Sequence, residues 1–342
     1  MTADHRRRTV LAVDLGGTTM KGAVVDEHGT TFARRTVLTP SHDVELALVE
    51  LFTELRDLAL TAATTPVGAA VVTPGSVDES RGVVRYASNL GWQDMPLLDV
   101  LASALSLPVA VGHDVRSAGL AEQRFGAARG RDDFVLIPIG TGVAAALVTG
   151  GGTVTGATGA AGEFGHIPVV ADGEPCACGQ RGCLEVYVSG AGLARRYAAA
   201  GGGERSSREI VGRLGSDAIA DRVWTEAVDV LAQGLNILTL LLDPGVIVLG
   251  GGFSRAGEVL LEPLAERMTA GLAWRERPEV LTSELADEAG RIGAAILAFG
   301  AAGLGEVIDA WSAASVIGPS RIPQRSPTTC SRHRRRRALG NS

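Results

Sequence analysis

Four potential metal ligands lie close together in the middle of the sequence. Cys176, Cys178 and Cys183 fall within eight residues, and His166 lies ten residues before the first of them. A structural disulfide fits three closely spaced cysteines poorly, because one thiol would stay unpaired. Three thiolates and one imidazole, in contrast, are a standard tetrahedral zinc set. Since the protein would supply all four ligands, the spacing predicts a structural Zn²⁺ site that holds a loop in place.

Two glutamates flank the same loop. Glu163 precedes His166 by three residues, and Glu185 follows Cys183 by two. Carboxylates on a loop held rigid by a metal are suited to accept hydrogen bonds from a polyol. Glutamates also occur at such positions on ordinary solvated surfaces, so the residues alone leave both interpretations open.

A glycine-rich segment near the start of the chain, DLGGTTMK at positions 14–21, combines a carboxylate, two hydroxyls and a lysine. Apolar runs on either side predict two short strands joined by a tight turn, which would also suit an ordinary hairpin. Backbone N–H groups and hydroxyls in such a turn form a concave anion site, and Asp14 is suited to hold Mg²⁺ beside it. Lys21, the only lysine in the chain, adds a compact positive charge that favours phosphate.

A second glycine turn, Gly140-Thr141-Gly142, repeats this arrangement about 125 residues later. Apolar runs at 134–139 and 143–149 flank it, as in the first turn. Two strand–turn–strand units, each able to bind phosphate, predict two similar lobes that face a shared nucleotide. A further glycine cluster at 250–252 follows an apolar run.

Asp114 follows a strand-like run at 109–111 and opens a helix that extends to about residue 125. An aspartate in this position most often caps the helix. A general base for a hydroxyl nucleophile would need the same place, because open α/β sheets form their clefts at the carboxyl ends of strands. Both interpretations stay open on the residues alone.

Alternating strand-like and helix-like segments separate these candidate sites. Strands are expected at 31–38 and 67–73, the second of them followed by a long loop to residue 92. Helices are expected at 44–63, 97–105, 221–242, 256–271 and 289–302. This alternation predicts a mostly parallel sheet covered on both faces.

The composition is typical of a soluble globular protein. The chain has 342 residues, enough for two lobes of ordinary domain size, of which 46% are hydrophobic and 20% charged. No uninterrupted apolar run reaches the length needed to cross a bilayer. The basic first eight residues lack the cleavage site of a signal peptide. We therefore expect a cytoplasmic protein without a membrane partner.

Charge is distributed unevenly along the chain. The net charge is −6, but residues 321–337 carry seven arginines, without which the body carries about −13. An acidic body argues against a nucleic-acid-binding core. From residue 312 onward the chain mixes proline, serine, threonine and arginine without apolar periodicity, so we expect a disordered, Arg-rich tail at 312–342. Cys330 lies in this tail.

Together, these motifs resemble the ROK family of sugar kinases and regulators, especially its bacterial glucokinase-like members. The combination of Gly-Glu-x-Gly-His with Cys-x-Cys-Gly-x-x-Gly-Cys-x-Glu carries the resemblance. The matching stretches lie between about residues 9 and 303, at 14–21, 89–92, 113–114, 140–142, 163–166, 176–185 and 250–252.

The resemblance implies an α/β chain with the actin-like ATPase (ribonuclease H-like) fold, in which two α/β lobes face each other across a cleft. The smaller, N-terminal lobe would comprise residues 1–112 and the helix at about 290–311. The larger lobe would comprise residues 113–289 and carry the zinc loop.

The resemblance also implies roles for the candidate residues. The ATP site would comprise Asp14, Gly16, Gly17, Thr18, Lys21, Gly140, Thr141 and Gly142 around the phosphates, with Gly250 and Gly251 near the adenosine. The sugar site would comprise Asn89, His113, Asp114, Glu163, His166 and Glu185, with His166 also ligating zinc. Many members have an asparagine before the aspartate, where this chain has His113.

The function implied is an ATP-dependent hexose kinase, with glucose as the preferred acceptor. Asp114 would accept the proton of a sugar hydroxyl, the one on C6, as its oxygen attacks the γ-phosphorus, while Mg²⁺ and the glycine turns neutralise charge. The alternatives are an N-acetylglucosamine or N-acetylmannosamine kinase and a sugar-responsive regulator. Regulators carry a helix-turn-helix domain for which the eight or so residues before the first strand leave no room. Family members are often dimers or tetramers, so a homo-oligomer is expected.

Overall fold

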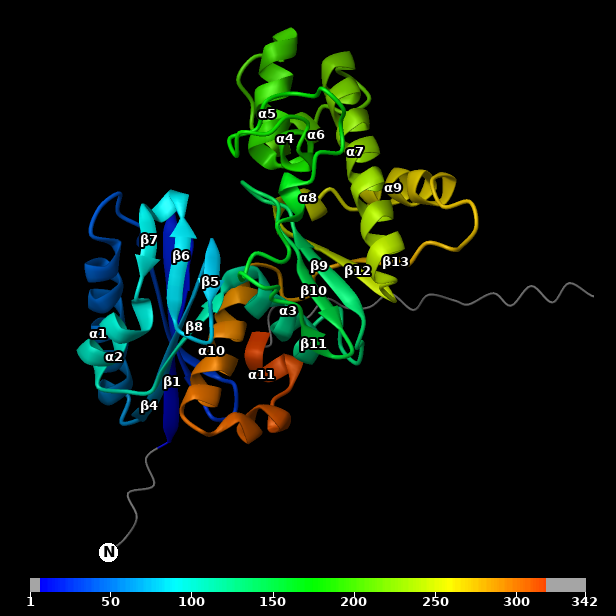
Figure 1. Cartoon of the computed structure of the whole chain (residues 1–342). Helices are drawn as coiled ribbons and strands as arrows, with labels where there is room; N and C mark the ends of the chain where they lie inside the picture. The colour runs from blue at the N-terminus through cyan, green and yellow to red at the C-terminus, as the bar shows by residue number, and fades with distance from the viewer. Residues whose placement is uncertain (1–6, 318–342) are drawn as a thin grey trace, which may run out of the picture.

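The computed structural model describes residues 7–317 (Figure 1). A five-stranded sheet at its N-terminal end has the order β3-β2-β1-β4-β8. Its strands are β1 (Arg8–Leu15), β2 (Thr19–Asp26), β3 (Thr31–Leu38), β4 (Thr65–Thr73) and β8 (Val109–His113). The first three strands pair antiparallel, whereas β4 pairs in parallel with β1 and β8 in parallel with β4. The central strand β1 is buried on both faces, which accounts for its uninterrupted apolar run.

A second five-stranded sheet repeats this plan. Its order is β11-β10-β9-β12-β13, again with three antiparallel strands followed by two parallel additions. The strands are β9 (Phe134–Pro138), β10 (Ala146–Thr149), β11 (Gly152–Thr153), β12 (Val246–Gly250) and β13 (Glu279–Thr282). The repeat expected from the two glycine turns is therefore present. The expected mostly parallel sheet is wrong, because a tight turn can join only antiparallel neighbours.

A small third sheet replaces the loop expected between residues 74 and 92. It consists of β5 (Ser76–Asp78), β6 (Val83–Ala87) and β7 (Trp92–Met95), all antiparallel, with the 3-10 turn η1 (Ser88–Leu90) between the last two. The strands are too short to show alternation in the sequence. They are held by the packing of Val77, Val84 and Trp92 into the core of the first sheet.

Helices cover both faces of the first sheet. On one face lie α1 (Val44–Thr61) and α2 (Leu97–Leu105). On the other lie α3 (Asp114–Phe125), α10 (Ala289–Ala301), the 3-10 segment η5 (Gly305–Ala310) and α11 (Ala313–Ile317). Helix α3 also packs against β9 and β10, so it lies between the two large sheets (Figure 1).

Helix α11 corrects the expected start of the tail. Val316 and Ile317 are buried beside Trp311, and the carbonyl of Val316 accepts a hydrogen bond from Arg291. Residues 312–317 are thus ordered by packing that their polar composition does not reveal. The rest of the expected tail, including Cys330, lies outside the described residues.

The remaining helices belong to the second sheet. They are α4 (Leu184–Val188), α5 (Gly190–Tyr197), α6 (Ser207–Val211), α7 (Ala218–Leu242), α8 (Gly251–Ser254) and α9 (Glu258–Ala270). Short helical turns occur at η2 (Phe164–His166), η3 (Ala198–Gly202) and η4 (Ala286–Glu288). Within residues 7–317, α7 alone has the length and hydropathy to span a membrane. Half of its apolar window is buried in the protein, where it packs against α4, α5 and α9 as a core helix does.

Candidate active site

A cavity of about 700 Å³ opens between the two large sheets. Twelve of the candidate residues from the sequence line it: Gly16, Gly17, Asn89, His113, Asp114, Gly140, Thr141, Gly142, Glu163, His166, Glu185 and Gly251. These residues come from both glycine turns, the third sheet, the start of α3 and the cysteine loop. Segments far apart in the sequence therefore meet in one place.

Four further nominated residues, Asp14, Thr18, Lys21 and Gly250, are not in the cavity lining. Gly250 ends β12 and is buried directly before Gly251. Thr18 is exposed in the first glycine turn, where its carbonyl accepts the N–H of Thr39 at 2.9 Å. Asp14 and Lys21 lie in β1 and β2, the strands that flank that turn.

Asp14 and Lys21 face each other across β1 and β2. They are direct partners in the antiparallel register, so their side chains project from the same face of the sheet. Burial and, next, the Asp114 carboxylate raise the pKa of Asp14, and although the Lys21 charge acts in the opposite direction the pKa is about 6. A β-carbon at Gly290, in the first turn of α10, would lie 2.8 Å from the Asp14 carboxylate. This helix can approach so closely because the position has no side chain.

Asp114 is the first residue of α3, immediately beyond β8. Its side chain is 28% exposed, and one carboxylate oxygen accepts the N–H of Val115 at 2.7 Å. Burial raises the pKa of this carboxyl to about 6. The helix cap is supplied by His113, whose Nδ1 accepts the N–H of Arg116 at 3.3 Å. Of the two interpretations that the sequence left open, capping therefore falls to the neighbouring residue, and Asp114 faces the cavity.

His113 is a neutral, buried imidazole. Because burial and the nearby Arg116 charge both disfavour protonation, its pKa falls to about 3. Its Nδ1 accepts a hydrogen bond, so the single ring proton is on Nε2. The approach of Nδ1 to the Asp114 carboxylate, at 3.4 Å, is therefore not an ion pair.

Glu163 and Glu185 reach the cavity from the two ends of the cysteine loop. Burial raises the pKa of Glu163; His166 lowers it, while Asp114 and Glu185 raise it. Glu185 accepts the N–H of Val143 at 2.8 Å and so supports the second glycine turn. A β-carbon on Gly142 would lie 2.9 Å from the same carboxylate oxygen, so glycine permits this approach. Three carboxylates thus border one part of the cavity.

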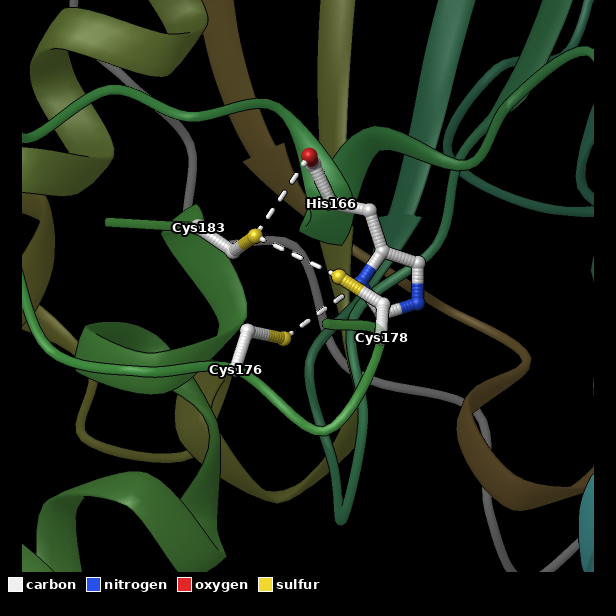
Figure 2. A group of neighbouring side chains, drawn as sticks. All are labelled: His166, Cys176, Cys178 and Cys183. Atoms are coloured by element: carbon white, nitrogen blue, oxygen red, sulfur yellow. Dashed lines mark hydrogen bonds between the residues drawn. The ribbon is translucent and has the colours of Figure 1, made fainter. Parts of the chain in front are cut away.

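The cysteine loop brings its four candidate ligands together (Figure 2). One ligand atom from each of His166, Cys176, Cys178 and Cys183 lies within 4.8 Å of all the others. His166 Nδ1 is 3.7 Å from Cys176 Sγ, and Cys178 Sγ is 3.7 Å from Cys183 Sγ. With metal–sulfur bonds of about 2.3 Å, tetrahedral geometry requires ligand atoms about 3.7 Å apart. The donor set and its spacing fit a single tetrahedral ion.

The loop closes through a glycine that no other residue could replace without rearrangement. Gly182 has φ +71°, and a β-carbon there would lie 1.8 Å from the carbonyl of Val170. The segment at Val169 and Val170 also pairs with the loop, since the N–H groups of both residues donate to the carbonyl of Gly182.

The sequence analysis missed the contribution of the third sheet to the cavity. Gly75, Ser76, Tyr86, Ala87 and Ser88 line it beside Asn89. It also missed the buried Arg116 behind Asp114. Neither belongs to a motif with a recognisable spacing, so only the fold reveals them.

Comparisons with known proteins find relatives along most of the chain. A family model described as ROK family matches residues 10–301. The chain is 31% identical over 313 residues to a glucokinase of Streptomyces coelicolor, covering 84% of this chain and 96% of that protein. It is 31% identical over 302 residues to an N-acetylmannosamine kinase of Escherichia fergusonii, covering 85% and 99%. It is similar to the crystal structure of a ROK family glucokinase from Streptomyces griseus in complex with glucose and AMPPNP, with a TM-score of 0.73, 32% identity and 85% and 99% coverage.

Proposed function

The chain belongs to the ROK family, and we propose that it is an ATP-dependent hexose kinase that phosphorylates glucose, with Asp114 as the general base. Its two repeated sheets are those of the actin-like ATPase fold. The observation that supports this function most directly is the shared cavity, in which an accessible carboxylate at the end of β8 meets both glycine turns.

Asp114 is suited to accept the proton of the attacking sugar hydroxyl. With a pKa of about 6 the carboxyl is ionised at neutral pH, yet it is a stronger base than an ordinary aspartate. The oxygen freed of its proton attacks the γ-phosphorus, and the proton stays on Asp114 until product leaves. The hydroxyl on C6 is the proposed nucleophile.

The glycine turns are suited to hold the ATP phosphates. Gly16 and Gly17 line the cavity on one side and Gly140, Thr141 and Gly142 on the other, so backbone N–H groups approach from both sheets. Thr18 and Lys21 would add a hydroxyl and a charge, and Gly250 and Gly251 would lie near the adenosine. Asp14 is the residue suited to hold Mg²⁺, which when bound neutralises charge on the phosphates.

The sugar would bind between the third sheet and the cysteine loop. Asn89, Glu163, His166 and Glu185 present amide, imidazole and carboxylate groups there. The neutral His113 would donate a hydrogen bond from Nε2 to a sugar oxygen. A charged imidazolium at this position would attract phosphate instead. Carboxylates that accept hydrogen bonds from neighbouring hydroxyls favour a polyol over an apolar acceptor.

The cysteine loop would hold a structural zinc ion through His166, Cys176, Cys178 and Cys183. The fit of these four atoms to one tetrahedral ion supports this assignment. Because the protein supplies every ligand, the ion would shape the loop that carries Glu163 and Glu185, without entering the reaction.

The two large sheets support a division of the chain into two lobes. We propose a smaller lobe of residues 1–112 with about 290–311, and a larger lobe of 113–289 that carries the zinc loop. We further propose that the enzyme is cytoplasmic, acts as a dimer or tetramer, and has neither a nucleic acid nor a membrane as partner.

A panel of acceptors tests the function. We expect release of ADP from Mg-ATP with glucose, and a clearly lower kcat/KM with N-acetylglucosamine and N-acetylmannosamine. An N-acetylhexosamine kinase is the second candidate, because a relative with that activity in its name is equally identical to this chain. A preference for the acetylated sugars would establish the second candidate, and replacing ATP by polyphosphate would identify the donor. A sugar-responsive regulator, the alternative of another class, would turn over none of them.

Activity should fall at acid pH. Asp14 and Asp114 both have a pKa raised to about 6, and both are needed ionised, so protonation of either removes activity. We expect kcat/KM for glucose to decline below about pH 6, with a slope that approaches two protons rather than one. The measurement is a pH profile from pH 5 to 8 with Mg²⁺ in excess over ATP, with circular dichroism to verify folding. A profile that is flat down to pH 5 would contradict the assignment.

Replacing Lys21 should weaken nucleotide binding. In Lys21→Met the pKa of Asp14 rises further, because the charge that lowers it is lost, and a charge-assisted contact to phosphate disappears. Such contacts contribute about 1.5–3 kcal/mol, so we expect the KM for ATP to rise on the order of tenfold or more. Arg35→Met, which removes a charge from neighbouring β3, is the control. Equal KM values for ATP in the two variants would exclude Lys21 from the site.

A further inference from the structure

Arg116 is a buried cation that the proposed reaction does not use. It lies in the first turn of α3, two residues after Asp114, and is 3% exposed. Its Nε donates to Glu79 Oε1 at 2.9 Å, one Nη to the carbonyl of Gly159 at 3.0 Å, and the other to the carbonyl of Val77 at 3.3 Å. A guanidinium is buried at an acceptable cost only when its donors are paired in this way.

The three acceptors come from opposite sides of the cavity. Val77 lies in β5 of the third sheet and Glu79 in the turn after it, whereas Gly159 follows β11 of the second large sheet. The two segments touch: Gly159 has φ +77°, and a β-carbon there would lie 2.6 Å from the Val77 carbonyl. Ser76 Oγ also donates to the Thr158 carbonyl at 3.1 Å. Arg116 therefore fastens both sides of the cavity to the helix that begins with Asp114.

The same pair fixes the residues around the proposed base. Glu79 Oε1 accepts the N–H of His113 at 3.0 Å as well as Arg116 Nε. The Arg116 N–H donates in turn to His113 Nδ1. Glu79 thus holds the backbone N–H of His113 and the side chain of Arg116, on either side of Asp114, and the segment held at Gly159 leads four residues later to Glu163.

We propose that Arg116, paired with Glu79, is a positioning residue that fixes Asp114 relative to the Glu163 segment across the cavity. Neither side chain lines the cavity, so the pair would act through the residues it holds rather than on the substrate. This inference rests on the proposed kinase function. It accounts for a guanidinium being buried and fully paired in the first turn of α3.

Matched substitutions test the pair. Arg116→Lys keeps the charge but cannot reach three acceptors, and Glu79→Gln keeps the shape but not the charge. Since misplacement of a catalytic group by about 1 Å can reduce the rate 10²-fold, we expect kcat in both to fall on the order of 10²-fold, with the KM for ATP within about twofold of wild type. Two control variants should leave kcat unchanged: Arg124→Lys, on the same helix, and Asp78→Asn, at the end of β5, where Asp78 pairs with Arg85 of β6.

A pH profile separates positioning from general stability. Asp114 faces Asp14 on β1, His113 on β8, Arg116 on α3 and Glu163 on the loop before His166. Of these, the Arg116 charge lowers the pKa of Asp114. The pH below which kcat/KM declines should therefore be higher in Arg116→Gln. In Arg116→Lys that pH should return to its wild-type value, while kcat stays low. The proposal would be overturned if activity fell only in proportion to the loss in Tm and the pH profile of kcat/KM in Arg116→Gln matched that of the wild type.

A measurement without turnover separates this inference from the kinase assignment. Hydrogen exchange of the amides at 155–163 should be faster in Arg116→Lys and Glu79→Gln than in wild type, and unchanged in Arg124→Lys and Asp78→Asn. Unchanged exchange in all four variants would overturn the proposed positioning role of Arg116 and Glu79. If exchange is faster in Arg116→Lys and Glu79→Gln but the wild-type protein phosphorylates no sugar, the proposed function is overturned. The role of Arg116 is then limited to holding the two sides of the cavity together.

Discussion

Asp114→Asn is expected to reduce kcat for glucose phosphorylation by ~10²–10⁴, the usual contribution of a general base, while glucose binding changes little. The amide has the shape of the carboxyl and its oxygen still accepts the N–H of Val115, so the start of α3 is preserved. What is lost is the carboxylate that is proposed to take the hydroxyl proton.

Steady-state kinetics with Mg-ATP, together with a glucose-binding titration of the inactive variant, measure this effect. Asp94→Asn, at an exposed carboxylate of β7, is the matched control and should behave as wild type. Asp114→Asn should also lower the pKa of Asp14, because the Asp114 charge raises it. Near-normal turnover in Asp114→Asn would remove this residue from the role of base.

Loss of one cysteine of the metal cluster should have the second largest effect. Cys178→Ser replaces an exposed thiolate ligand by a poor one, so we expect the bound zinc to fall well below one per chain. Removal of a structural metal belongs to the substitutions that cost more than about 4 kcal/mol, and at about 2–4 °C per kcal/mol we expect a fall in Tm on the order of 10 °C.

Activity should fall together with the zinc content, because His166 and Glu185 reach the cavity from this loop. Elemental analysis and thermal unfolding of the purified variants are the measurements. Cys330→Ser, the fourth cysteine of the chain, provides the control with the same chemical change outside the cluster. Wild-type zinc stoichiometry in Cys178→Ser would refute the ligand set, and full activity after removal of zinc would separate the ion from the sugar site.

The sequence by itself determined what contiguous residues encode. The first glycine turn, the strand at 31–38, the helix that begins at residue 289 and the cysteine spacing are all present where the sequence indicated them. Each depends on neighbours within about twenty residues: apolar runs, glycines that permit a bend, and ligands that a metal requires at fixed distances. The repeat of one strand–turn–strand unit further along the chain revealed the paired sheets.

Only the tertiary structure decided how these pieces meet. Whether Asp114 caps a helix or faces a cavity was undecided until His113 proved to supply the cap. The third sheet, the docking of α11 and the contacts of Arg116 each join residues that are distant in sequence, such as Arg116 and Gly159. Their stability comes from desolvation and pairing in the folded chain, which no local pattern records. A buried arginine looks like any other in the sequence until its three acceptors are brought to it.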